Sequence, residues 1–424
     1  MINEMAKILG IGIATLDIIN EVAGYPVEDS EQRALAQRQR TGGNVTNTLT
    51  VLRQFDHDCA LAAVLTPDAD GRQIQEKLAQ RGIDLSSAQI LGFGHAPTSY
   101  ITLNRQNGSR TIVHYRDLPE FDLNAFLKID LAPFDWLHFE GRHCMDTAAM
   151  LAMARRAAGT KILSLEVEKE RPYLDQLFPF PDVVFFSRAF AEQRGFEDPE
   201  AFLNAAHQWA PQAVLVLGWG ATGAYLKESL NDPVQLVPAQ PVPSVVDSIG
   251  AGDTLIAGVI HARASQAGAD WQAAVSFGVR LAERKIQQFG FDGLAVDPNA
   301  KNQPLCHLDD LGPEDAMGVQ PVNGVPSVIV VRDHRTIRAY RNVCPHNGSA
   351  LSKGVRGFLA DKSTGPSDGM SLRCRLHNAY FEPLTGACTG GPCPGTHLTP
   401  VAIRQVGEMI YLDDLDENAN PTGK

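Results

Sequence analysis

The chain has 424 residues with a formal net charge of −12 at pH 7, and 44% of its residues are hydrophobic and 20% charged. This length exceeds what one hydrophobic core usually serves, so we expect more than one domain, and the acidic balance argues against a nucleic-acid partner, which needs a basic face. No apolar run reaches the ~18–20 residues of a membrane span, and residues 1–10 lack the features of a signal peptide. The odd number of cysteines, seven, argues against a disulfide framework and favours a reducing compartment, so we expect a cytoplasmic protein without a membrane partner.

From the N-terminus to about residue 294, short apolar runs alternate with helical stretches. This alternation predicts an α/β domain with a parallel sheet covered by helices. Two stretches, 32–40 and 98–115, are strand-like but more polar, which suits a small accessory sheet standing off the main domain. Helices are expected from Asn44 to Phe55 and from Thr254 to Ser265. The expected strands of the main sheet are residues 7–14, 59–64, 161–166, 182–186 and 213–217.

A glycine turn early in the chain carries side chains suited to a small polar substrate. Gly42-Gly43-Asn44-Val-Thr-Asn47 opens a helix with two amides three residues apart on one face. Asp17 follows the first strand, and amides with a carboxylate at strand ends suit sugar hydroxyls. The alternative is that Asn44 and Asn47 cap the helix and Asp17 forms a turn, and the residues alone leave both readings open.

A second glycine turn, Gly250-Ala-Gly-Asp253, precedes the helix at 254–265. Glycines at a helix N-terminus let backbone N–H groups approach phosphate oxygens, and the helix dipole favours negative charge there. Asp253 would repel a phosphate, so it fits a base that takes the proton of an attacking hydroxyl. Taken alone, a helix start of this kind is more often structural.

Beyond residue 297 the sequence changes in character. Residues 299–303 lie in a polar stretch that predicts a linker. Short strands expected at 325–331 and 336–340, with turn residues between them and no helical period, predict an all-β domain over residues 304–415. Residues 361–369 are typical of a surface-loop insertion and residues 416–424 of a frayed tail.

Two short motifs in this domain, Cys344-Pro-His346 and Cys374-Arg-Leu-His377, each contain one Cys and one His. A Rieske [2Fe–2S] site needs this set, with two Cys on one iron and two His on the other. A tetrahedral zinc site has the same ligands, but zinc fingers usually keep both Cys on one knuckle, so the iron–sulfur reading is favoured. Cys388 and Cys393 lie near the site in sequence and are either buried thiols or a redox pair.

Seven segments, in order, make residues 10–294 resemble the pfkB (ribokinase-like) carbohydrate kinases, and within that family the ketohexokinases. The segments are residues 29–33, 42–47, 108–112, 137–142, 166–169, 246–253 and 289–294. The resemblance implies a ribokinase-like doubly wound sheet with a small β lid over residues 1–298. It also implies ATP- and Mg²⁺-dependent phosphorylation of a sugar hydroxyl, with fructose or a related ketose as the acceptor.

The same resemblance implies roles for individual residues. Asp253 would be the base that activates the sugar hydroxyl, and Gly250, Ala251 and Gly252 would stabilise charge that develops on the transferred phosphoryl group. Asp29, on the lid, would enter the site of a second subunit, which implies a homodimer. The residues that would bind the sugar are Asp17, Gly43, Asn44 and Asn47. Those that would bind ATP are Arg110 at the phosphates and, beside the adenine, Gly220, Ala221, Thr222 and Gly223.

One segment departs from the family pattern. Many ribokinase-like kinases follow the strand that matches residues 183–186 with an Asn-x-x-Glu sequence, whose carboxylate helps to organise Mg²⁺. Here Ser187-Arg-Ala-Phe190 stands at that place. Glu166 or Glu168 would then have to substitute through water.

Residues 304–415 resemble the ferredoxin-type Rieske domains, on the two ligand pairs and on the downstream turn Gly391-Pro-Cys-Pro394. Neither ligand loop has the extra cysteine of respiratory Rieske proteins, which favours a lower-potential cluster. Two functions stay open: a sugar kinase with an electron-transfer or redox-regulatory module, and an electron-transfer protein whose kinase fold is a sugar or nucleotide sensor. An electron-transfer role would require a redox partner, which the sequence does not identify. The resemblance implies a [2Fe–2S] cluster held by Cys344, His346, Cys374 and His377.

Overall fold

The structure is a computed structural model. It describes residues 5–157, 161–243, 245–265, 270–295, 304–319, 327–333, 336–351, 358 and 371–412. The chain divides into two compact units, residues 1–294 and 295–424. The expected linker at 299–303, the insertion at 361–369 and the tail at 416–424 lie outside the described residues.

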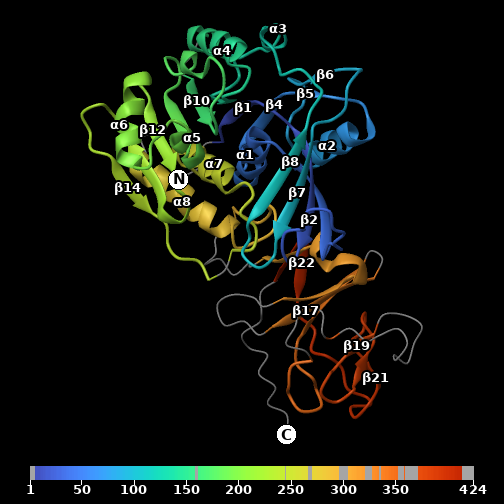
Figure 1. Cartoon of the computed structure of the whole chain (residues 1–424). Helices are drawn as coiled ribbons and strands as arrows, with labels where there is room; N and C mark the ends of the chain where they lie inside the picture. The colour runs from blue at the N-terminus through green and yellow to red at the C-terminus, as the bar shows by residue number, and fades with distance from the viewer. Residues whose placement is uncertain are drawn as a thin grey trace. The chain divides into compact units, whose positions relative to one another are not determined.

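The first unit is built on an eight-stranded mixed sheet in the order β14-β13-β12-β11-β10-β9-β1-β4 (Figure 1). Six strands are parallel, and β13 and β14 are antiparallel at one edge. The parallel strands are apolar runs because helices cover both faces. The expected doubly wound α/β fold is confirmed. The strands are β1 (Lys7–Ile11), β4 (Asp58–Ala62), β9 (Trp136–Glu140), β10 (Ile162–Val167), β11 (Val183–Ser187), β12 (Val214–Gly218), β13 (Gly223–Lys227) and β14 (Gln235–Pro238).

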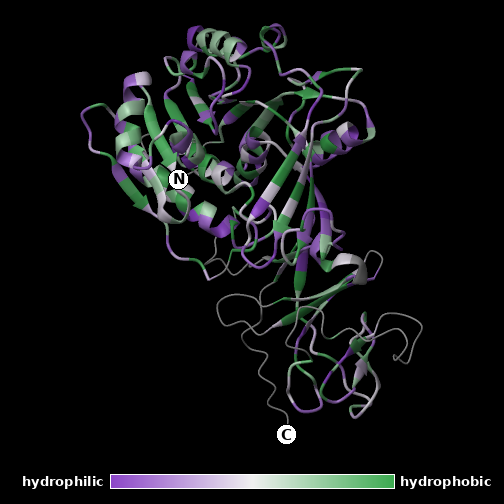
Figure 2. Cartoon of the chain, viewed as in Figure 1, coloured by the Kyte–Doolittle hydropathy of each residue, from purple (hydrophilic) through white to green (hydrophobic). Residues whose placement is uncertain are grey.

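Two hydrophobic clusters lie on the two faces of this sheet, because successive strand residues point to opposite sides. Ile8 belongs to the cluster that includes residues of α1, α2, α7 and α8, whereas its neighbour Leu9 belongs to the cluster with α4, α5 and α6. Figure 2 shows the strands of the main sheet as largely hydrophobic. The helices are α1 (Asn44–Leu52), α2 (Ala69–Gln80), α3 (Leu123–Phe126), α4 (Cys144–Arg156), α5 (Arg188–Gln193), α6 (Pro199–Trp209), α7 (Ala251–Ser265) and α8 (Trp271–Lys285), with 3-10 turns η1 (Arg53–Phe55), η2 (Leu174–Gln176) and η3 (Gly220–Thr222).

A separate four-stranded sheet, the lid, has the order β3-β2-β7-β8. The expected single stretch at 98–115 is two strands, because the chain turns at Gly108, where φ is +69°. A small apolar cluster joins the lid to the turn before α7, since Ile19 and Ile101 pack with Ile249. The lid strands are β2 (Thr15–Val22), β3 (Ala36–Gly42), β7 (Thr98–Asn104) and β8 (Arg110–Tyr115), and a short pair, β5 (Val64–Leu65) and β6 (Gln89–Ile90), lies outside the lid.

The second unit is all-β in its described part, apart from the 3-10 segment η4 (Leu308–Glu314). It contains three small sheets, each of three strands, as expected for the C-terminal domain. None of the described helices of either unit has the length and apolar character needed to cross a membrane. The strands are β15 (Pro304–His307), β16 (Ala316–Val319), β17 (Val328–Asp333), β18 (Thr336–Arg341), β19 (Leu372–Arg373), β20 (Tyr380–Phe381), β21 (Cys388–Gly390), β22 (Ile403–Val406) and β23 (Met409–Leu412).

Candidate functional site

The carboxyl group of Asp253 lies buried where two helices begin. Asp253 is in the first turn of α7, and the Nδ2 amide of Asn47, in the first turn of α1, donates to its Oδ2 at 2.7 Å. The Thr48 hydroxyl donates to the backbone oxygen of Asp253 at 3.3 Å. Burial raises the pKa of Asp253 to about 7, although the Asn47 hydrogen bond opposes this rise. A pKa near neutrality is well matched to general-base catalysis.

The turn before Asp253 exposes backbone rather than side chains. Gly250 has a φ of +79°, and a Cβ on it would collide with the ring of Phe291. A Cβ on Gly252 would meet nothing within 4 Å, so the space beside this residue is open. The first N–H groups of a helix have no partner inside the helix and form the positive end of its dipole. The Ala251 N–H makes only a long bond, 3.4 Å, to the Ser248 carbonyl oxygen, so the turn Gly250-Ala251-Gly252 is a backbone surface suited to an anion.

An ion cluster that sequence reasoning missed holds this turn in place. Lys285 Nζ donates to Asp247 Oδ2 at 2.7 Å and to the Asp247 carbonyl at 2.9 Å, and Arg40 Nη1 donates to the same Oδ2 at 3.1 Å. Burial alone would raise the pKa of Asp247, but the charges of Arg40 and Lys285 lower it to about 2. Lys285 belongs to α8 and Arg40 to lid strand β3, so the turn is tied to both elements.

The helical spacing of buried positions is the one feature of the sequence that could have identified Lys285. Ala274, Gly278, Leu281 and Lys285 recur at spacings of four, three and four, which places the lysine on the apolar stripe of its helix. All four are buried in the structure. A lysine at a core position of a helix indicates a buried partner of opposite charge.

The first residues of α1 face carboxylates from other elements. Gly43 has a φ of +101°, and a Cβ there would overlap the carbonyl oxygen of Ile13, so only glycine fits. The Nδ2 amide of Asn44 donates to Glu166 Oε1 at 2.8 Å. Neither Asn44 nor Asn47 caps α1, whose N-cap has no side-chain hydrogen bond. The capping alternative is therefore wrong, and both amides point to the site.

Glu140 and Glu166 lie side by side at the carboxyl ends of β9 and β10, where they are register partners. Glu140 Oε1 accepts from the Val45 backbone N–H at 2.9 Å. In each glutamate the second oxygen, Oε2, is buried and has no hydrogen-bond partner in the described part of the chain. Arg142 forms an ion pair with Glu140, and its Nε lies 3.7 Å from Glu140 Oε2. Burial raises the pKa of Glu140 to about 7, and burial together with the charge of Asp253 raises that of Glu166. A carboxylate oxygen without a partner can coordinate Mg²⁺ directly or accept a hydrogen bond from a water bound to the cation.

Asp17 is buried in lid strand β2 beside the start of α1. Thr15 Oγ1 donates to Asp17 Oδ1 at 2.8 Å. The carboxylate fills the space that a Cβ on Gly42 would occupy, so this glycine leaves room for it. Gly42 directly precedes Gly43 and α1, and the structure thus brings Asp17 to the turn that carries the two amides.

Within one chain, Asp29 lies away from Asp17 and the turn before α1. It is exposed in the loop between β2 and β3, where its φ is +57°. This loop follows Val22, and five residues of strand, or roughly 17 Å, separate Val22 from Asp17.

The expected nucleotide residues lie at two places around the site. Arg110, the first residue of β8, donates from Nη1 to the Ser248 hydroxyl at 3.1 Å, just before Gly250. The turn Gly220–Thr222 follows β12, and Gly223 begins β13. In the sheet order β12 is two strands from β10, so this turn lies at the carboxyl edge that also carries Glu166.

Ser187, at the start of the segment that departs from the family pattern, has a structural task. Its Oγ accepts from the Phe190 backbone N–H at 3.0 Å, which caps α5, and donates to the Glu168 carbonyl oxygen. Glu168 itself is exposed, whereas Glu166 is buried beside Asn44. Of the two expected substitutes, Glu166 is the one that faces the site.

In the second unit the two expected ligand loops, Cys344–Ser349 and Cys374–Ala379, share one backbone design. In each, the first N–H donates to the last carbonyl, at 2.7 and 2.9 Å, and the fifth N–H donates to the first carbonyl, at 2.8 and 2.9 Å. The fifth residues, Gly348 and Asn378, both have a positive φ. Each loop therefore places a buried Cys at its first position and a His two or three residues later.

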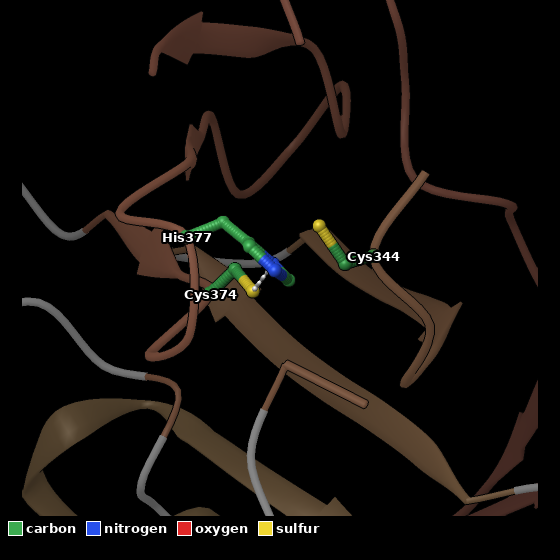
Figure 3. Close-up of side chains that lie close together, drawn as sticks. All are labelled: Cys344, Cys374 and His377. Atoms are coloured by element: carbon green, nitrogen blue, oxygen red, sulfur yellow. Dashed lines mark hydrogen bonds between the residues drawn. The ribbon is translucent and has the colours of Figure 1, made fainter. Parts of the chain in front are cut away.

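The four expected ligands converge. The Sγ atoms of Cys344 and Cys374 and a ring nitrogen of His377 all lie within 4.8 Å of one another (Figure 3), and the His346 ring centroid is 4.7 Å from that of His377. Asn347 Nδ2 lies 3.1 Å from His377 Nε2, whereas His377 Nδ1 is 3.5 Å from Cys374 Sγ. The ring thus turns Nδ1 toward the sulfurs, and Asn347, which sequence reasoning did not single out, orients it. This donor set fits a cluster with Cys₂ on one iron and His₂ on the other.

Comparisons with known proteins assign both units to families. The model of the pfkB family carbohydrate kinases matches residues 5–295, and that of the Rieske [2Fe-2S] domain matches residues 301–405. Ketohexokinase of Mus musculus is 37% identical over 301 residues, 69% of this chain and 99% of that protein. A fructokinase of Klebsiella pneumoniae is 27% identical over 328 residues, 72% of this chain and 98% of that protein. A ribokinase of Arabidopsis thaliana, solved with ribose and ATP, shares the fold with a TM-score of 0.56 at 17% identity, over 68% of this chain and 94% of that one.

Proposed function

The chain belongs to the pfkB family of carbohydrate kinases and carries a C-terminal Rieske [2Fe–2S] domain, and we propose that it transfers the terminal phosphoryl group of ATP to a hydroxyl of fructose or a related ketose. The observation that carries this proposal is the buried contact between Asn47 and Asp253, which sets a carboxyl group with a near-neutral pKa at the start of α7. The 37% identity to a ketohexokinase supports the choice of acceptor.

In this reaction Asp253 takes the proton of the attacking sugar hydroxyl. The backbone N–H groups of Gly250, Ala251 and Gly252 stabilise the charge that develops on the phosphoryl oxygens. Asn47 holds Asp253 with its amide hydrogen and offers its carbonyl oxygen to the sugar. The other sugar ligands are Asp17, Gly43 and Asn44.

ATP carries Mg²⁺ to the site, where the cation neutralises charge on the phosphates. We assign its organisation to Glu166 and Glu140, because the buried Oε2 atom of each has no hydrogen-bond partner among the described residues. These two glutamates replace the carboxylate that the Ser187 segment lacks. Arg110, next to Ser248, reaches the phosphates, and the turn 220–223 borders the adenine.

The lid is proposed to hold a second copy of the chain. Its outer strand β8 is exposed along its whole length and includes Ile112, Val113 and Tyr115, with Val113 66% exposed. An edge strand with exposed apolar side chains is a surface for pairing. In such a homodimer, Asp29 of one subunit reaches the sugar site of the other. A kinase that depends on ATP fits a cytoplasmic location.

The Rieske domain is proposed to serve electron transfer or redox regulation rather than the phosphoryl transfer itself. Phosphoryl transfer is not a redox reaction, so a [2Fe–2S] cluster takes no part in that chemistry. Bound by Cys344, His346, Cys374 and His377, the cluster would exchange single electrons with a redox partner. A kinase rate that depends on the oxidation state would make the domain regulatory.

The test is ADP release by the cluster-loaded protein with a panel of sugars headed by D-fructose, in oxidised and in dithionite-reduced samples. We expect turnover that requires a ketose. Turnover with another sugar alone would overturn the choice of acceptor. No turnover with any sugar in either state would favour the alternative, an electron-transfer protein whose kinase fold is a sensor.

A further inference from the structure

Two cysteines outside the ligand set lie against each other in the second unit. The Sγ atoms of Cys388 and Cys393 are 3.1 Å apart. An S–S bond is ~2.05 Å long, so about 1 Å of approach separates this contact from a disulfide. Cys388 begins β21 and is half-buried, whereas Cys393 is buried in the turn that follows.

The turn that carries the pair packs against the second ligand loop. A Cβ on Gly391 would stand 2.5 Å from the carbonyl oxygen of Asn378 and 2.7 Å from Cα of Ala379, so the glycine lets the two backbones touch. Cys393 also belongs to the same hydrophobic cluster as Cys344 and Cys374. The pair therefore lies in the wall of the cluster site without belonging to its ligands.

We propose that Cys388 and Cys393 form a reversible disulfide that fastens this turn over the second ligand loop. The co-reactant is a low-molecular-weight disulfide. The thiolate of Cys388, the more exposed partner, attacks one of its sulfurs and releases one small thiol. Cys393 then attacks the Cys388 sulfur of the mixed disulfide and releases the second. Two protein thiols are oxidised, one small disulfide is reduced to two thiols, and the two protons leave with those thiols.

The bond would restrain the backbone next to a ligand. It closes a ring over residues 388–393, and Gly391, inside that ring, touches Asn378, the residue after His377. A restrained cover hinders the opening that releases a cluster. We therefore expect the oxidised pair to slow the loss of the cluster to a chelator.

The experiment uses full-length, cluster-loaded protein treated with a small disulfide or with a small thiol, then quenched in acid, alkylated and digested with trypsin. The peptide from Leu376 to Arg404 contains Cys388 and Cys393 and no other cysteine. We expect two alkyl groups on it after reduction. After oxidation we expect none, with a mass lower by two hydrogen atoms than that of the unalkylated dithiol peptide. Two alkyl groups after oxidation, or a bond to Cys344 or Cys374, would overturn the proposal.

Single variants test the order of the exchange. Cys393→Ser removes the second attacking thiol, so Cys388 should keep the mixed disulfide. Cys388→Ser leaves the buried Cys393, which should stay unmodified. Cys306→Ser, a buried cysteine in a different hydrophobic cluster of the same unit, is the matched control and should leave the closure unchanged. A retained visible cluster spectrum shows that each variant is folded. The assigned order would be contradicted if the small thiol became attached to Cys393 in the Cys388→Ser variant but not to Cys388 in the Cys393→Ser variant.

Discussion

Asn47 and Asp253 are 206 residues apart in the sequence, yet the Nδ2 amide of Asn47 donates to Oδ2 of Asp253 at 2.7 Å. A hydrogen bond to the charged form of a carboxyl group favours that form. Burial disfavours it and raises the pKa of Asp253 to about 7. Burial and this hydrogen bond therefore act in opposite directions on the protonation of Asp253, and the charges of Glu168, Glu140 and Arg110 add to them.

Replacing Asp253 by Asn keeps the shape of the side chain and removes the base. We expect kcat to fall by roughly 10²–10⁴-fold, the usual contribution of a general base. The visible spectrum of the cluster should not change, because the ligands belong to the other unit. Steady-state ADP release and an absorption spectrum measure the two properties, and sugar-dependent turnover near the wild-type rate would refute the assignment of the base.

The pH profile should show which neighbours control Asp253. The group acts when deprotonated, so kcat/KM should rise with pH through about 7 and then level off. Asn47→Ala removes the hydrogen bond that favours the carboxylate and should move this limb to higher pH. The negative charge of Glu140 raises the pKa of Asp253. Glu140→Gln removes this charge, so the substitution should lower the pKa of Asp253 and move the limb to lower pH. Shifts of the same sign in both variants would contradict this account, whatever the change in the absolute rate.

Lys285 should matter for the stability of the first unit. Lys285→Met leaves the buried carboxylate of Asp247 with Arg40 as its remaining cation, and we expect a loss of about 3 kcal/mol in the free energy of unfolding. All four tryptophans lie in the first unit, at positions 136, 209, 219 and 271, so their fluorescence during urea unfolding reports on this unit. Arg280→Met, at an exposed position of the same helix, is the control and should stay within about 0.5 kcal/mol of the wild type. Equal effects of the two substitutions would show that the ion cluster does not stabilise the turn.

The sequence predicted the parts of the kinase site better than the links between them. The glycine turns at 42–43 and 250–252 are local, so their backbone role follows from neighbouring residues. Both cations that bind Asp247 lie far from it in the sequence: Lys285 is 38 residues away and Arg40 is 207 residues away. No local pattern joins residues at such sequence separations. Glu140 lay in a recognised segment, but its role depends on its register with Glu166 on the next strand. Strand order is a property of the whole sheet.

The convergence of the four proposed iron–sulfur ligands was easier to predict, because each short motif contributes one Cys and one His. His377→Ala should abolish the Rieske absorption and electron paramagnetic resonance signals, since His₂ coordination of one iron is lost. His397→Ala, an exposed histidine of the same unit, should keep both signals. A Rieske spectrum retained in His377→Ala would mean that the ligand set is wrong. Asn347, which contacts His377 across the two loops, could not be found from either motif alone.

A sugar site shared between two subunits would allow two inactive chains to restore each other. Asp29→Asn should impair the partner's site, and Asp253→Asn should impair its own. In a mixed dimer one site would combine an intact Asp253 with an intact Asp29 of the other chain. Random exchange makes half of the dimers mixed, each with one complete site, so roughly a quarter of the wild-type activity should return.

The mixture of the two variants, incubated long enough for subunits to exchange, is assayed beside each variant alone. Val113→Asp places a charge on the exposed face of β8 and should both shift the protein to a monomer in sedimentation and prevent the recovery. Recovery near a quarter that disappears with Val113→Asp supports a dimer through the lid. A mixture no more active than the mean of its components would show that Asp29 does not complete a partner's site. Asp29 would then have no part in sugar binding, because roughly 17 Å of lid strand separates its loop from Asp17 in the same chain.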